Sequence, residues 1–232
     1  MTTPSPLWFA TRGAGTVSLV LLTAVVLLGI ATTTRQQGGA WPRFLSSRLH
    51  SNLALAAIVF LCLHVMTAVL DPFAHLRWRD AIVPFGASYR PVWLGFGVVA
   101  FELVVALALS ALVRRRIGYG AWRVLHWLAY ACWPLALLHG LGTGTDVRSG
   151  WFEVIDAACV GAVFAALVAW RLAYGWPRAA GFRTGAAISS GVALVLLVLW
   201  MLNGPLAPGW ARAAGTPPSL LHTAASSSRL SG

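Results

Sequence analysis

RVLHWLAYACWPLALLHGLG, residues 123–142, is an apolar run that carries two histidines, His126 and His139. A helix needs about 20 residues to cross the hydrocarbon core of a bilayer, which is the length of this run. Ionisable side chains inside such a span are rare and usually functional. The run therefore predicts a membrane helix whose two imidazoles have a specific role.

A second apolar run, LHSNLALAAIVFLCLHV (residues 49–65), carries a matching pair, His50 and His64. The two pairs are separated by about 21 Å and about 19.5 Å along straight helices. Each helix thus places one imidazole near one membrane face and the other nearer the opposite face. If the two helices are neighbours that run in the same direction, His50 faces His126 and His64 faces His139.

Facing histidines on two helices are the arrangement that supplies both axial ligands of a haem iron in a helix bundle. Two such sites stacked across the bilayer would form a path for electrons. Proton relay and metal transport remain alternatives, but they usually recruit acidic partners. The only carboxylate that we expect well inside a span is Glu102. The four histidines are therefore predicted to ligate two haems.

The spacing within the second pair requires a distorted helix. Fourteen residues at about 100° each return His64 to within about 40° of the face of His50, whereas thirteen leave His139 about 140° from that of His126. Pro134 lies between the latter two and removes a backbone hydrogen bond. We predict a distortion near Trp133-Pro134 that lets both rings reach the core.

The composition is that of a multispanning membrane protein, with 58% hydrophobic and 10% charged residues and a mean hydropathy of +0.75 over 232 residues. We predict an all-α integral membrane protein, a six-helix transmembrane bundle over residues 14–206, between an N-terminal segment (1–13) and a flexible tail (207–232). We expect the first helix to be retained rather than cleaved as a signal peptide. The predicted spans are 14–33, 49–70, 92–113, 122–142, 153–172 and 184–206.

The net charge of +11 comes from 17 basic residues, all arginines, at the ends of apolar segments. There, positive charge sets membrane orientation, so we do not expect nucleic-acid binding. Ten arginines follow the first, third and fifth spans and seven lie on the other side, which predicts both termini outside the cytoplasm. The lysine-free, alanine-rich composition is typical of a GC-rich bacterium, so we expect a multi-pass protein in contact with lipid in a bacterial cell membrane. The ten arginines that follow the first, third and fifth spans are Arg35, Arg43, Arg48, Arg114, Arg115, Arg116, Arg123, Arg171, Arg178 and Arg183.

The remaining candidate residues carry weaker signals. His75, in the loop after the second span, is expected to be solvent-exposed rather than an acceptor contact, and no role is expected for His222. The three cysteines form no CxxC pair or metal-ligand spacing, and are interpreted as packing residues. They are Cys62, Cys132 and Cys159.

At these histidines the chain resembles the ferric reductase-like transmembrane domain family, over roughly residues 10–175. That family includes the membrane parts of ferric reductases and NADPH oxidases, and the haem subunit of bacterial methionine-sulfoxide repair. The resemblance rests on the H-x13-H of residues 50–64, a following long loop, and the H-x12-H of residues 126–139. It implies a bundle with two b-type haems that passes electrons from the cytoplasmic face to an outer acceptor.

Carried over residue by residue, the resemblance assigns His50 and His126 to the inner haem and His64 and His139 to the outer one. Arg48 and Arg123 become candidate propionate contacts, since guanidinium pairs with carboxylate in a bidentate way; equally, each could be a positive-inside anchor. Weaker outer candidates are Arg77, Arg79 and Arg90, and Trp127 and Tyr130 are expected to pack along the haems.

The chain departs from ferric reductases and oxidases of this family after the fifth span. Those proteins continue into a flavin- and nicotinamide-binding region, whereas this chain continues into another apolar segment and contains no GxGxxG after a strand. We therefore expect an oxidoreductase subunit with a separate donor, either a flavoprotein reductase or quinol. The outer acceptor could be ferric iron, oxygen or an extracytoplasmic flavin protein. A quinol-oxidising cytochrome b-like subunit and a non-redox transporter or scaffold are the alternatives.

Overall fold

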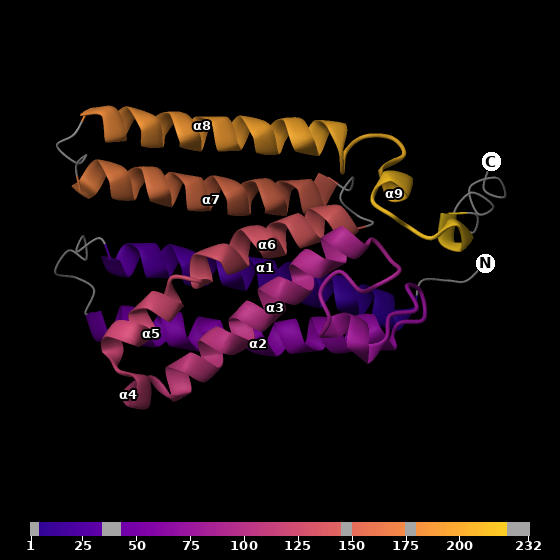
Figure 1. The fold of residues 1–232 in the computed structure, drawn as a ribbon, viewed down its shortest axis with the longest axis horizontal. Coiled ribbons are helices and arrows are strands. Elements are labelled where there is room, and N and C mark those ends of the chain that lie inside the picture. The colour runs from indigo at the N-terminus through magenta and orange to yellow at the C-terminus, as the bar shows by residue number, and fades with distance from the viewer. Residues whose placement is uncertain (1–4, 34–42, 145–149, 175–179, 222–232) are drawn as a thin grey trace.

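The structure is a computed structural model that describes residues 5–33, 43–144, 150–174 and 180–221. Helices are the only regular secondary structure in these ranges (Figure 1). Long apolar sequences form them because only a helix satisfies its backbone groups within one segment in hydrocarbon. The prediction of an all-α chain is therefore confirmed.

Five of the predicted spans form helices that are long and apolar enough to cross a membrane. They are α1 (Pro6–Thr33), α2 (Arg43–Leu70), α3 (Pro91–Leu112), the pair α5 (Tyr119–His126) and α6 (Ala129–Thr143), and α7 (Gly150–Tyr174). The sixth forms α8 (Ala180–Asn203), of which the described apolar part, Leu194–Asn203, is shorter than a span. The six-span count thus stays a prediction.

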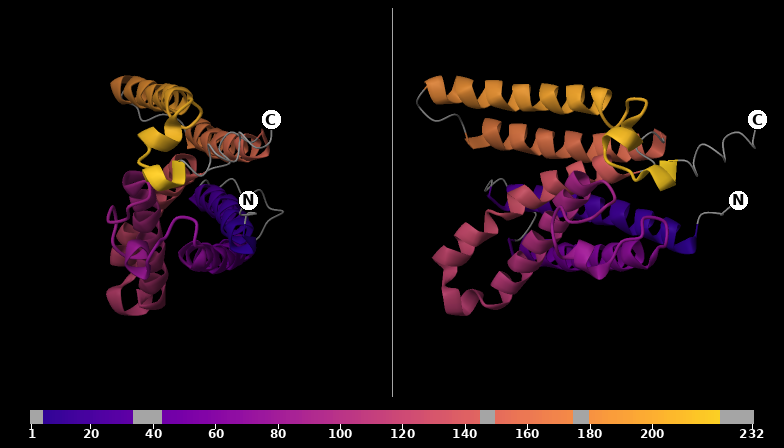
Figure 2. Two further views of the ribbon diagram at one scale, coloured as in Figure 1. Left: turned by 90° about the vertical axis from the view of Figure 1, so that its right-hand side faces the viewer. Right: turned by 45° about the vertical axis from the view of Figure 1, so that its right-hand side comes forward.

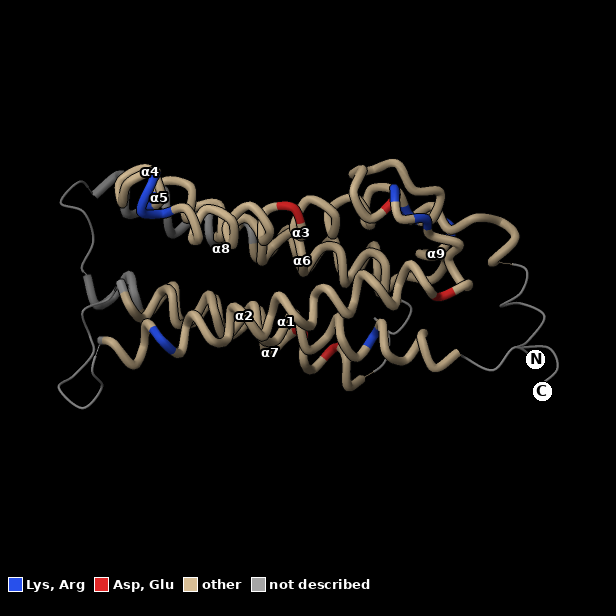
Figure 3. The backbone as a smooth tube through the Cα atoms, turned by 90° about the horizontal axis from the view of Figure 1, so that it is seen from below, with Lys and Arg blue, Asp and Glu red and all other residues tan. Residues whose placement is uncertain are grey.

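The long helices alternate in direction, so their ends gather at the two ends of the bundle (Figures 1 and 2). One end holds α4 (Arg114–Ile117) and α5. The other holds the start of α1, the loop 71–90 and the short helix α9 (Trp210–Ala213), so both terminal regions lie at one end. We refer to these as the α4–α5 end and the α9 end. The tube in Figure 3 places most charged residues towards these ends.

Two helix pairs form the part of the bundle that carries the histidines. α1 packs along α2, and α3 packs along α6 (Figure 3). α7 covers α1, and its Cys159 joins Leu19 of α1 and Leu137 and Leu141 of α6 in the buried core. Trp133 of α6 donates from its indole N–H to Thr23 Oγ1 of α1 at 2.9 Å. These contacts join the α1–α2 pair to the α3–α6 pair on the side that α7 covers.

The fourth predicted span is broken, as expected, but not at Pro134. The break lies at Trp127-Leu128, one to two turns earlier, and Pro134 sits inside α6. Four hydrogen bonds around the break are of the i→i+3 kind, from the N–H groups of residues 127, 128, 130 and 131. A 3₁₀ turn advances about 120° per residue, so four such steps reduce the expected 140° mismatch to about 60°. This local tightening brings His139 towards the side of the bundle that His126 faces.

The loop 71–90 closes the α9 end. Its one-turn helix η1 (Trp78–Ala81) is capped by Asp80, whose Oδ2 accepts the Arg77 N–H at 3.0 Å. Arg90 is buried in the left-handed region with φ 42°, and its guanidinium donates to the Gly142 carbonyl at 2.8 Å and to Thr216 Oγ1 at 2.9 Å. Arg90 therefore joins the loop to α6 and to the C-terminal segment.

Candidate functional site

The four histidines of α2, α5 and α6 meet in two pairs. The ring centroids of His50 and His126 are 6.2 Å apart with an interplanar angle of 65°. Those of His64 and His139 are 6.0 Å apart at 82°. Two metal–imidazole bonds of about 2.0–2.1 Å, plus the radii of both rings, give about 6 Å for rings that share a metal. Both separations match this value.

Each histidine pair supplies only two protein ligands, so it suits a metal whose other ligands come from a cofactor. Within the described ranges, no group of three or more His, Cys, Asp and Glu side chains could hold a bare ion. Two axial imidazoles are sufficient for a haem iron, because the porphyrin supplies the remaining four nitrogens. The donor set therefore fits haem.

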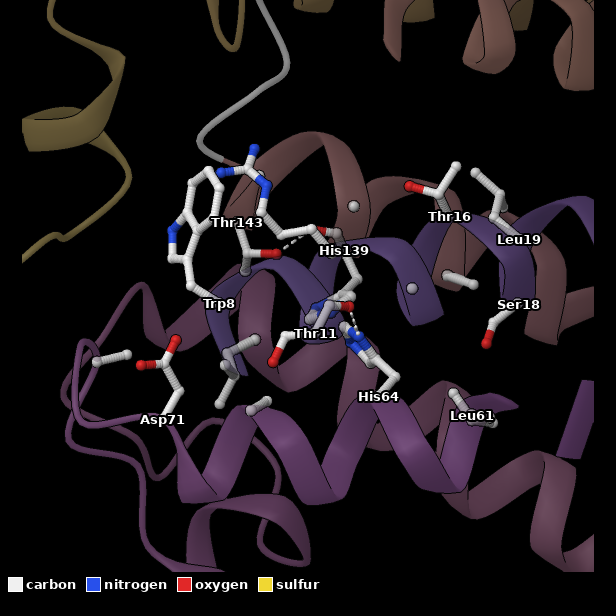
Figure 4. A pocket seen from close by; sticks show the side chains of 18 of the residues that line it. Trp8, Thr11, Thr16, Ser18, Leu19, Leu61, His64, Asp71, His139 and Thr143 are labelled. Carbon is white, nitrogen blue, oxygen red and sulfur yellow. Dashed lines mark hydrogen bonds between the residues drawn. The ribbon is translucent and has the colours of Figure 1, made fainter. Parts of the chain in front are cut away.

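A slot lies beside the His64–His139 pair, which we call the outer pair after its predicted side of the membrane, with His50–His126 as the inner pair. Two cavities, of about 220 Å³ and about 100 Å³, are each lined by both His64 and His139. Both also touch Leu61 of α2 and Ala136 of α6, so they are two parts of one apolar slot between the helix pairs. Figure 4 shows the larger part, with His64 and His139 approaching from α2 and α6.

Backbone carbonyls fix the proton on both outer imidazoles. His64 Nδ1 lies 2.8 Å from the carbonyl oxygen of Thr11 in α1, and His139 Nδ1 lies 3.0 Å from that of Trp93 in α3. A carbonyl can only accept, so Nδ1 carries the hydrogen and Nε2 keeps its lone pair. This is the tautomer in which metal-binding histidines are commonly held.

The inner pair is held differently. His50 Nδ1 is buried beside the Val25 backbone, but without a hydrogen bond of good geometry in the described part of the chain. His126 stacks on Trp122 at 4.9 Å and 25°, and the Arg114 guanidinium lies 5.2 Å from the centre of the Trp122 ring. Aromatic stacking, rather than a carbonyl, supports the His126 ring.

The arginines chosen from sequence occupy different environments. Arg48 and Arg123 are exposed on α2 and α5, towards the end where the inner pair lies, so their propionate role stays a prediction. Arg77 and Arg79 are exposed, with Arg79 3.3 Å from Asp80. Arg90 is buried and bound to Gly142 and Thr216, which explains it as a structural tie.

Sequence reasoning missed Arg12, the single charged residue of α1, which lines the larger cavity. Its guanidinium lies 4.0 Å from the Trp8 ring centre, close to Tyr89. Burial raises the pKa of the Tyr89 hydroxyl, while the charges of Arg90 and Arg12 act in the opposite direction. The Arg12 guanidinium and the neutral Tyr89 phenol therefore both line the slot at its α9 end.

Trp127 and Tyr130 pack on each other at 5.9 Å and are 68% and 47% exposed, and they line neither of the cavities beside His64 and His139, so their packing along a haem stays a prediction. The prediction for Glu102 is corrected by the structure. Glu102 is exposed, and it is not the only carboxylate inside a span, because Asp156 of α7 is only 3% exposed. Neither Asp156 oxygen has a hydrogen-bond partner among the described residues. The position of Asp156, the seventh residue of α7, could have indicated from sequence that this carboxylate lies inside a span.

The other minor candidates fall into three groups. His75 is exposed, as expected. Cys132 and Cys159 are buried packing residues, whereas Cys62 is exposed. His222 lies outside the described residues.

Comparison with known proteins gives consistent relatives. Residues 6–146 match a family described as a domain of unknown function, DUF8596. The protein-methionine-sulfoxide reductase haem-binding subunit MsrQ of Bordetella parapertussis is 32% identical over 181 residues, covering 75% of this chain and 78% of its own. The MsrQ of Ralstonia nicotianae is 28% identical over 197 residues, covering 82% and 81%. No solved structure matches the chain.

Proposed function

The chain belongs to the family of haem-binding subunits of protein-methionine-sulfoxide reductase, and we propose that it carries electrons across a bacterial cell membrane through two b-type haems. The electrons would enter from a donor on the α4–α5 side, predicted to be cytoplasmic. They would leave to an extracytoplasmic acceptor on the α9 side. When bound, haem supplies reversible one-electron chemistry at its iron.

The observation that carries this proposal is the pair of histidine pairs, each with ring centroids about 6 Å apart. A packing role would not require two pairs with this same separation at two depths of the bundle. His50 and His126 would hold the inner haem, and His64 and His139 the outer haem. The outer imidazoles are already in the tautomer that leaves Nε2 free to bind iron.

The residues around the outer pair would orient the group and exclude water from it. The slot is lined mainly by aliphatic and aromatic side chains, and an apolar shell around haem controls solvent access and reduction potential. Arg12 stands where a cation would meet a propionate at the α9 end of the slot. At the inner pair, Arg48 and Arg123 are the corresponding candidates.

The partners follow from the family and from the ends of the bundle. The relatives are named as subunits of a protein-methionine-sulfoxide reductase, so we propose the catalytic subunit of such a reductase as the acceptor. This assignment takes precedence over ferric iron, oxygen or another flavin protein. The donor is a separate flavoprotein reductase or quinol, and a reduction assay with each distinguishes the two.

The visible spectrum of the purified protein tests the proposal. We expect a reducible b-type spectrum with about two haems per chain. His64→Ala or His139→Ala should lose one haem and retain the other, because each substitution would remove one of the two imidazoles proposed to hold the outer haem. His75→Ala, in the exposed loop, is the matched control and should keep both. A colourless protein would contradict the proposal.

A further inference from the structure

Two glycines stand directly against the outer histidines, on helices that carry no ligand themselves. Resting on the proposed function, we propose that Gly15 of α1 and Gly97 of α3 are positioning residues for the outer haem. Each leaves one backbone carbonyl uncovered, and that carbonyl holds a ligand imidazole by its Nδ1 hydrogen. The glycines thereby set the orientation and the basicity of both outer ligands.

The first half of this arrangement lies between α1 and α2. A Cβ placed on Gly15 would lie 2.9 Å from both Cε1 and Nδ1 of His64, which is closer than real side chains approach. The same imidazole bonds the carbonyl of Thr11, four residues before Gly15. The ring therefore occupies the space that any other side chain at position 15 would take.

The second half repeats the arrangement between α3 and α6. A Cβ on Gly97 would overlap the Nδ1, Cγ and Cε1 atoms of His139. This imidazole bonds the carbonyl of Trp93, again four residues before the glycine. The two segments share the pattern x-x-G-x-G, as TRGAG (11–15) and WLGFG (93–97).

Helix geometry explains the spacing of four. The carbonyl of residue i accepts the N–H of residue i+4, and side chains tilt towards the N-terminus, so the side chain at i+4 covers that carbonyl. A glycine at i+4 leaves the oxygen accessible, and its second lone pair can accept an imidazole N–H. The glycine and the carbonyl four residues before it thus act together to hold the imidazole, and we call this combination the glycine–carbonyl device.

The inner pair provides an internal contrast. Gly29 of α1 lies four residues after Val25, and a Cβ there would be 3.8 Å from His50 Cε1, an ordinary contact. Among the described residues, His50 Nδ1 lies beside the Val25 backbone without a hydrogen bond of good geometry, and His126 stacks on Trp122. We therefore assign the tight form of the device to the outer haem alone.

The consequence is electronic as well as geometric. A hydrogen bond from Nδ1–H to an acceptor makes the imidazole a more basic ligand, which favours the ferric iron. Weakening that bond should raise the reduction potential of the outer haem. A glycine that served only to pack helices would change stability without this selective shift.

Alanine substitutions with matched controls test the proposal on the full-length, haem-loaded protein. Gly15→Ala and Gly97→Ala should each raise the midpoint potential of the outer haem, or lose that haem, with the inner haem unchanged. The electron paramagnetic resonance signal of the outer ferric haem should shift in the same variants, because its g-values report ligand orientation. Gly13→Ala on α1 and Gly161→Ala on α7 meet open space, line neither cavity, and should change neither readout. Gly29→Ala should leave the inner haem intact.

The outcomes separate this proposal from the proposed function. Absence of haem from the unaltered protein overturns the proposed function. A normal two-haem spectrum with unchanged potential and resonance signal in both Gly15→Ala and Gly97→Ala overturns the role of the glycines alone. If these variants fail to accumulate, the unaltered protein still decides: after transfer to deuterated buffer, electron–nuclear double resonance should show slowly exchanging Nδ1 protons on the outer ligands. Rapid exchange there would contradict the proposal.

Discussion

Arg12 and Arg90 are both at least partly buried near the α9 end, yet only Arg12 lines the histidine slot. Arg90 donates to the Gly142 carbonyl and to Thr216 Oγ1, so its charge is directed to α6 and the C-terminal segment. Arg12 lies over the Trp8 ring and lines the cavity that reaches His64 and His139. A cation beside a haem favours the reduced iron, since reduction removes one positive charge. Arg12 is therefore the residue that should tune the outer haem.

Arg12→Gln should lower the midpoint potential of the outer haem while leaving the inner haem unchanged. Removing a partly buried charge near the iron costs of the order of 1 kcal/mol of stabilisation of the reduced form, or about 40 mV for a one-electron couple. A redox titration followed at the haem absorption bands measures it. Arg77→Gln, at an exposed position outside both cavities, is the control. Equal potentials in the two variants would remove Arg12 from the outer site.

The facing histidine pairs could be predicted from sequence, but the residues that support them could not. Histidines in hydrocarbon are rare, so four of them at two similar spacings indicate facing pairs without any structure. Arg12 lies 52 positions before His64, and no local pattern connects them. Arg48 and Arg123 are close to His50 and His126 in sequence, yet both are exposed. Contacts made across helices depend on rotation and tilt, which hydropathy does not specify.

The break between α5 and α6 shows how an element adapts to the spacing of its ligands. Hydropathy predicts one span over 122–142, and the 13-residue spacing predicts that it cannot be a regular helix. The distortion is confirmed, but it precedes Pro134 by several residues. The missing N–H of Pro134 leaves the Tyr130 carbonyl without its i+4 donor. The preceding turn tightens with i→i+3 bonds, so the effect of the proline appears on its N-terminal side.

Pro134→Ala should therefore reduce haem binding even though it improves helix propensity. Alanine restores the i→i+4 donor, which favours about 100° per residue through the break and rotates His126 and His139 apart by up to about 80°. We expect haem content to fall from about two towards one per chain, measured by the pyridine haemochrome assay. Pro91→Ala, at the first position of α3, is the control, because a proline there replaces no helical donor. Two retained haems with an unchanged spectrum would show that residues 127–131 fix the break without Pro134.

Over the whole molecule, the outer histidines lie on different helices from the backbone carbonyls that orient them. α2, α5 and α6 supply the imidazoles, while α1 and α3 supply carbonyls and close-packed glycines. The pairing of α1 with α2 and of α3 with α6 leaves the ligand-bearing faces opposite each other, with the slot between them. His50 and His64 stand about 21 Å apart along α2, so the two pairs lie at different depths of the bundle. Two haems at these depths would form a path for electrons across the membrane.

This arrangement predicts that electrons cross the membrane only when both pairs are intact. In sealed vesicles with the α4–α5 end outward, a membrane-impermeant reductant added outside should reduce ferricyanide enclosed inside. His64→Ala and His139→Ala should keep an inner haem that is reduced at the normal rate, but transfer to the enclosed ferricyanide should fall to the level of protein-free vesicles. The physical reason is that removing the outer haem leaves an apolar stretch without an electron carrier between the inner iron and the α9 end. His75→Ala should transfer electrons as the unaltered protein does, and protease access to a tag on the N-terminus establishes which end faces outward. Undiminished ferricyanide reduction by His64→Ala would show that the outer pair is not on the electron path.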